Sequence, residues 1–142
     1  MHFLFDMSYL RQKSDFNIDA AKVLISKGLY APSVHCSYYS CFQLMKYAIK
    51  SFFGTTYKEQ TASIAGNPKQ STHKYVIDYI IRELKKIEQS REVQNLRRNI
   101  KDLQNFRIEA DYENIEINYD NGQKALEKAE EIRSYLITNL KL

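Results

Sequence analysis

The chain has 142 residues, 44% of them hydrophobic, which is enough for one domain whose core needs neither metal nor disulfides. Only four glycines and two prolines accompany abundant Leu, Ile, Lys, Glu and Tyr, and this composition argues against a turn-rich β fold. From this length and composition we expect a single all-α domain over residues 1–142. The net charge of +4 is modest and by itself identifies no partner.

The first two helices are predicted from apolar spacing and from stop signals. Residues 8–27 form the first, which ends at Gly28. Its inner side is predicted to hold Phe16, Ala20, Val23 and Leu24. After a break over residues 28–31, Pro32 suits the first turn of a second helix. Its apolar stripe is the clearest in the chain and comprises Val34, Tyr38, Cys41, Phe42, Met45, Ala48, Ile49 and Phe52.

Residues 54–70 lack a helical period and contain two glycines and a proline, so they are predicted to form one long loop. Ser71 or Thr72 can then cap a third helix. Its stripe is Val76, Ile77, Ile80, Ile81, Leu84 and Ile87. A break near residues 89–90 leads to a fourth helix with Val93, Leu96, Ile100 and Leu103 on its stripe.

The last helix is predicted to begin after Asp120, which with Gln123 resembles a capping box. It buries Ala125, Ala129, Ile132, Leu136 and Leu140. Each helix has one apolar stripe, so none is stable alone, and packing the stripes together gives an up-and-down antiparallel bundle of four long helices plus a fifth.

The two cysteines, Cys36 and Cys41, lie five residues apart on one predicted helix and point to different faces, so we expect reduced thiols in a cytoplasmic protein. The opening residues 1–10 are too short an apolar run for a signal peptide and contain Asp6. No later stretch approaches the roughly 20 apolar residues of a membrane span, so we expect no membrane association.

The charges are unevenly distributed along the chain. The net charge is +3 over residues 1–67, +5 over residues 68–107 and −4 over residues 108–142. A basic middle section can attract phosphates. Its charges nevertheless alternate in sign along the helices, which is more typical of ordinary solvated faces.

The stripe of the fourth helix continues to Arg107, and then to Ala110 or Asp111. An arginine on a core-facing line has to reach solvent or be paired, because a lone buried charge costs several kcal/mol. Asp111, one turn later, is the expected partner. The pair is then either a structural ion pair or a polar notch that binds a phosphate or a partner.

The aromatic and histidine side chains allow similar alternatives. Of the adjacent Tyr38 and Tyr39, one ring points inward, and a buried phenol requires a hydrogen-bond acceptor. His35 and His73 each stand alone in the sequence, so a structural or surface role is the first expectation. No sequence motif for a di-iron site, zinc site, P-loop or serine hydrolase occurs, and no cofactor is expected.

Three segments in this order resemble proteins of the HEPN family. Residues 28–30 with residues 37–42 are similar to the second helix of HEPN domains, which carries a Tyr pair and a following Phe. Residues 107–112 resemble the Arg-x-x-Ala-Asp-Tyr segment of their fourth helix, and residues 71–73 resemble the His-containing start of the third. The resemblance extends over residues 8–140, almost the whole chain.

The resemblance implies a helical bundle that commonly forms homodimers. Family members are metal-independent ribonucleases, toxins or partners of small nucleotidyltransferases, or modules that bind nucleotides or RNA. The ribonucleases use an Arg followed roughly four to six residues later by a His. In this chain no histidine follows Arg107.

We therefore expect a non-catalytic HEPN module that binds a nucleotide, RNA or a protein partner through Arg107, Asp111, Tyr112, Tyr39 and Tyr38. Such a module would fit a toxin–antitoxin-like pair with a nucleotidyltransferase. The alternative is a ribonuclease toxin with a rewired site that uses Arg107 and His73 as its catalytic residues. A third possibility is a bundle that only self-associates.

Overall fold

The computed structural model describes residues 8–88 and 90–142, and all regular structure in this part is helical, as predicted. The six helices are α1 (Tyr9–Ser26), α2 (Tyr30–Ser51), α3 (Tyr57–Ala65), α4 (Thr72–Ile87), α5 (Arg91–Tyr112) and α6 (Tyr119–Leu140). Residues 1–7, where we expected no signal peptide, and Gln89, near the break predicted before the fourth helix, lie outside the described residues.

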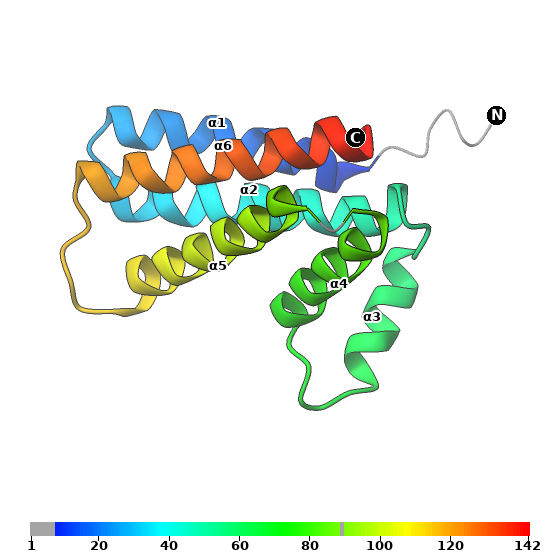
Figure 1. Cartoon of the computed structure of the whole chain (residues 1–142). Helices are drawn as coiled ribbons and strands as arrows, with labels where there is room; N and C mark the ends of the chain where they lie inside the picture. Colours follow the sequence, from blue (N-terminus) through cyan, green and yellow to red (C-terminus); the bar gives the residue numbers. More distant parts are fainter. Residues whose placement is uncertain (1–7, 89) are drawn as a thin grey trace.

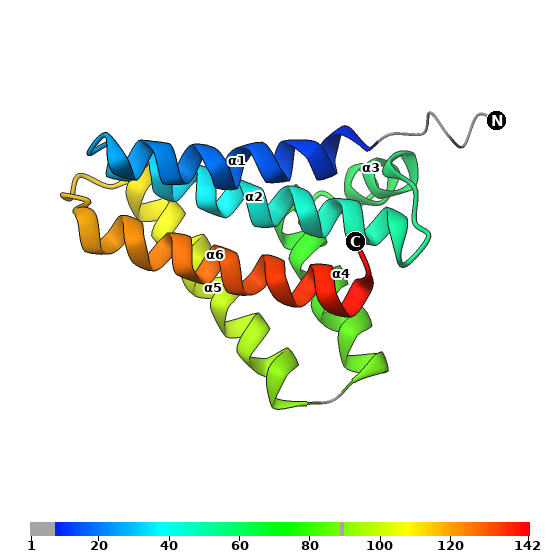
Figure 2. The same ribbon diagram turned by 90° about the horizontal axis from the view of Figure 1, so that it is seen from above.

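Helix α2 is the central element of the bundle. It packs against α1, α4, α5 and α6. Figures 1 and 2 show α1, α2 and α6 running side by side, with α3 and α4 near the end of α2. Small side chains permit this close packing: a Cβ on Gly122 of α6 would lie 3.1 Å from the Ser33 hydroxyl oxygen of α2.

The inner side of α1 was predicted wrongly. Phe16 and Val23 are 61% and 57% exposed, and the buried residues are Ser14, Ile18 and Ala21. The side chains on this packed face are mostly small, and one of them is polar. Ser14 can be buried there because its hydroxyl donates to the Ser40 carbonyl of α2. The largest apolar side chains of α1 therefore do not mark its buried face. Likewise, Phe52 and Ile87 lie at the ends of their predicted stripes and are exposed.

Residues 54–70 are not one long loop, because they contain α3. The helix starts with a capping box, in which the Thr56 hydroxyl accepts from the Glu59 amide and the Glu59 carboxylate accepts from the Thr56 amide. This Thr-x-x-Glu pattern is a local sequence signal for the start of a helix. Buried Gln60 then attaches α3 to the rest by donating to the Lys46 and Thr55 carbonyls.

The remaining helix ends agree more closely with prediction. Ser71 caps α4 by accepting from the Lys74 amide. The capping box of α6 is formed by Asn118 and Asn121 rather than by Asp120 and Gln123. None of the helices in residues 8–88 and 90–142 has the length and apolar character that a membrane span requires.

A buried polar contact joins α6 to α1. The Arg133 guanidinium donates to the Ser14 hydroxyl and, at 2.6 Å, to the Asp15 carboxylate. Burial raises the pKa of Asp15, but the hydrogen bond from Arg133 and the charge of Arg11 outweigh it, so the pKa lies below its usual value.

We predict that Asp15→Asn lowers the free energy of unfolding by up to about 1 kcal/mol at neutral pH. The folded pKa is below the unfolded value of about 3.9, so the carboxylate stabilises the fold above that value and loses this effect as pH falls through the folded pKa. Urea unfolding of both proteins across this pH range should show the difference disappearing in acid. Asp19→Asn, on the same helix, is the control, and a difference that persists in acid would contradict the charge argument.

Candidate functional site

Eight side chains from three helices meet at one end of α5. Helix α2 contributes His35, Tyr38, Tyr39 and Phe42, which share one face because they lie three or four residues apart. His73 lies in the first turn of α4, and Arg107, Asp111 and Tyr112 lie in the last two turns of α5. We call these eight residues the Arg107 cluster.

The Arg107 guanidinium is surrounded by three tyrosine rings. Its central carbon lies 5.1 Å from the ring centre of Tyr38 and 5.6 Å from those of Tyr39 and Tyr112. Arg107 is only 7% exposed, although it is charged. Cation–π attraction to the ring faces partly replaces the water that the guanidinium lost.

The hydrogen bonding of Arg107 is incomplete. Its Nη1 lies 3.4 Å from the Tyr112 hydroxyl and 3.5 Å from the Asp111 carboxylate, and both separations are long. Its Nε is buried and has no hydrogen-bond partner within the described part of the chain. A guanidinium offers five N–H donors, so this one retains donors for an added anion.

Asp111 is shared between two partners, His35 and Arg107. Its carboxylate oxygen lies 2.8 Å from Nδ1 of His35, closer than it lies to Arg107. The ion pair predicted between Arg107 and Asp111 is therefore present, but His35 competes for the same oxygen. Asp111 compensates the charge of Arg107 only in part.

Tyr38 and His73 form a partly buried hydrogen bond of 2.7 Å between the phenol oxygen and Nδ1. Burial raises the pKa of Tyr38 far above its usual value, so the phenol keeps its proton and donates it to Nδ1. His73 is thus the acceptor that a buried phenol requires, and its own proton is on Nε2. Burial and the nearby charge of Arg107 lower the pKa of His73, which keeps the ring neutral at pH 7.

His35 belongs to the cluster, although the sequence suggested a structural or surface role for it. Its ring centre lies 4.6 Å from that of Tyr39, one turn further along α2. The i, i+4 spacing of His35 and Tyr39 was the available signal, but only the fold reveals Asp111 opposite. Burial and the charge of Asp111 raise the pKa of neighbouring Cys36, so its thiol stays protonated and is a poor nucleophile.

The structure brings together all the residues singled out from the sequence. Asp111, Tyr112, Tyr38 and Tyr39 each contact Arg107. His73 reaches this group through Tyr38 and through ring contacts with Phe42 and Tyr39. Across the described ranges 8–88 and 90–142, no three His, Cys, Asp or Glu side chains are grouped as a metal site would require.

In a comparison with known families, the family model described as the HEPN domain matches residues 7–140. The match covers nearly the whole chain and includes every residue of the Arg107 cluster. Comparison with curated proteins and with solved structures gave no significant match.

We predict that NMR titration of His73 gives a midpoint below the usual value of about 6.5. Arg107→Met should raise this midpoint, because it removes a nearby positive charge and leaves the ring buried. The unfolded chain takes up the His73 proton more readily, so the same shift makes the fold less stable as pH falls below the unfolded value. Arg91→Met, at the other end of α5, is the control, and an unchanged midpoint in Arg107→Met would contradict the assigned cause.

Proposed function

Because the chain belongs to the HEPN-domain family, a family of nucleotide- and RNA-related modules, we propose that it is a non-catalytic member that binds a phosphate group of a nucleotide or of RNA through the Arg107 cluster. The observation that carries the proposal is the incompletely bonded, buried guanidinium of Arg107.

A phosphate would complete the hydrogen bonding of Arg107. Burying a charge without an opposite charge close by costs free energy. Within the described residues, the carboxylate nearest to the Arg107 guanidinium is that of Asp111, whose oxygen lies 3.5 Å from Nη1. Guanidinium and phosphate form short, charge-assisted, bidentate hydrogen bonds. The free Nε is one arm of such a pair, so phosphate is the ligand chemistry that best fits the donors present.

The aromatic rings of the cluster suit the rest of a nucleotide. Tyr112 covers the guanidinium from the solvent side and is 74% exposed, so its ring can move at little cost in buried area. Tyr39 is half-buried beside exposed His35. Bases stack on such rings with little dependence on sequence, which favours a nucleotide or an RNA end over an inorganic phosphate.

The alternative function is metal-independent RNA cleavage by Arg107 and His73. It is favoured by the burial of His73 near Arg107, which lowers the pKa of the ring and leaves it able to accept a proton at neutral pH. Against it, Nδ1 of His73 is occupied by the Tyr38 phenol, and no hydrogen bond joins His73 to Arg107 among the described residues. We therefore place binding before catalysis.

A homodimer and a nucleotidyltransferase partner are further parts of the proposal. Tyr9, Phe16 and Val23 are exposed on α1, and their spacing of seven residues places them on one side of the helix. Such an apolar row supports pairing with a second copy. The toxin–antitoxin-like pairing is supported by family membership alone, and a nucleotidyltransferase gene beside this one would strengthen it.

We predict that Arg107→Lys weakens binding of the nucleoside monophosphate that binds best by at least about tenfold, measured by calorimetry. Lysine keeps the charge but cannot make the bidentate contact, whereas helicity and Tm should stay close to those of the unaltered protein. Arg91→Lys is the matched control on the same helix. Binding that survives Arg107→Lys unchanged, or no binding of any nucleotide, would overturn the proposal.

The same proteins should leave total RNA intact in the presence of a chelator. Metal-free cleavage that disappears in His73→Ala would instead establish the ribonuclease alternative. Cleavage that persists in His73→Ala would point to a contaminating nuclease and leave the calorimetry as the deciding result.

We predict that Phe16→Glu raises the dissociation constant of the homodimer by at least about tenfold, measured by light scattering over a concentration series. A buried carboxylate in an apolar seam lacks a partner and is costly. Ile87→Glu is the matched control, because Ile87 is exposed to the same 61% on another helix. Equal effects of the two substitutions would exclude α1 as the dimer contact.

A further inference from the structure

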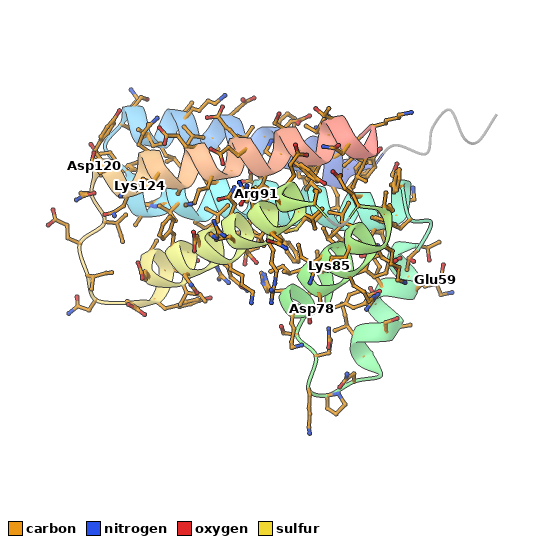
Figure 3. All side chains as sticks on the ribbon, viewed as in Figure 1. Glu59, Asp78, Lys85, Arg91, Asp120 and Lys124 are labelled. Carbon is orange, nitrogen blue, oxygen red and sulfur yellow. The ribbon has the colours of Figure 1, made fainter. Side chains whose placement is uncertain are left out.

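A basic groove runs between α4 and α5, outside the Arg107 cluster. One part of it has a volume of about 470 Å³, with Ile77 and Ile81 in its lining. The adjoining part, of about 570 Å³, shares Lys85, Arg97 and Lys101 with the first. Six cationic side chains line the two parts together: Arg82, Lys85, Lys86, Arg97, Arg98 and Lys101. Figure 3 labels Lys85 and Asp78 on the α4 side.

The positive charge of this groove is poorly compensated. Its two carboxylates, Asp78 and Asp102, are paired with Lys74 and Lys128, which are not part of its lining. Lys86 is paired with Glu83. The other five cations form no ion pair within residues 8–88 and 90–142, and all are exposed. The basic middle section of the sequence is therefore a local concentration of charge and not an evenly neutralised face.

The groove adjoins the Arg107 cluster. Figures 1 and 2 show α4 and α5 as neighbouring antiparallel helices, and the cluster uses the first turn of α4 and the last two turns of α5. Ile77 in the groove lies one turn after His73, and Asn105 lies two residues before Arg107. From Gln94 to Arg107 the rise along α5 is about 20 Å, enough for several phosphates of one strand.

We propose that this groove holds the sugar-phosphate backbone of single-stranded RNA and leads one end of the strand to the Arg107 cluster. The cationic rim attracts successive phosphates, while Ile77 and Ile81 in the lining are almost fully buried and belong to the core. A duplex hides its bases, whereas a single strand can turn them onto the tyrosine rings of the cluster. The inference extends the proposed function, on which its endpoint at Arg107 rests.

The test compares two variants with the same change in net charge. The groove variant combines Lys85→Gln, Arg97→Gln and Lys101→Gln. The control variant combines Lys13→Gln, Lys27→Gln and Lys58→Gln, three exposed lysines outside the groove lining. Fluorescence anisotropy with a labelled oligouridine of about ten nucleotides measures the affinity of each protein over a salt series.

The groove variant should lose at least about tenfold in affinity, and its slope of log Kd against log salt should fall by about 2, since three cations no longer displace counterions. The control variant should keep the slope. Equal losses in the two variants would show that net charge alone governs binding and would overturn the groove. Equally tight binding of polyglutamate, or of an RNA duplex with the same charge, would also contradict the proposal, because it would show that the groove does not select single-stranded RNA.

Mononucleotide binding separates this inference from the proposed function. The groove variant should bind the mononucleotide as the unaltered protein does, whereas Arg107→Lys should bind the oligouridine more weakly with an unchanged salt slope. If no mononucleotide binds but the groove variant still loses its RNA affinity, the proposed binding site at the Arg107 cluster is contradicted and the proposed RNA groove is supported. If mononucleotide binding is normal and the groove variant also binds RNA normally, only the proposed RNA groove is contradicted.

Discussion

The charge of Arg107 inside the bundle is the constraint on which the site depends. A guanidinium at this depth is tolerated because Tyr38, Tyr39 and Tyr112 present their rings to it and Asp111 lies one turn away. Tyr38 and Tyr39 belong to α2, the helix that packs against most of the others, whereas Tyr112 belongs to α5 itself. Arg107 and Tyr38 are thus part of the packed core, whereas Tyr112 and His35 form the exposed edge of the site.

Helix periodicity explains why the overall fold could be predicted from the sequence. The stripes of α2, α4, α5 and α6 contain large apolar residues at 3-4 spacing, and most of these residues are buried. The prediction was wrong where the buried face is polar, as on α1, where Ser14 packs inward while Phe16 remains in solvent. It also missed α3, whose capping box is a local signal without an apolar stripe around it.

The candidate site was only partly predictable. Arg107 stood out because it interrupts an apolar stripe, and Asp111 followed from the spacing of one turn. His35 and His73 are far from Arg107 along the chain, and their positions depend on how α2 and α4 pack, which a single sequence does not specify. The contact of His35 with Asp111 and that of His73 with Tyr38 are therefore tertiary facts.

Tyr112, which covers Arg107, is the last residue of α5. The final turn of a helix frays more readily than its middle, since its carbonyls lack helical partners. If that turn unwound, the Tyr112 ring would leave the guanidinium while Leu103 and Ile100 stayed packed in the core. Such local opening would expose Arg107 without global unfolding, and amide hydrogen exchange at the end of α5 would measure how often it occurs.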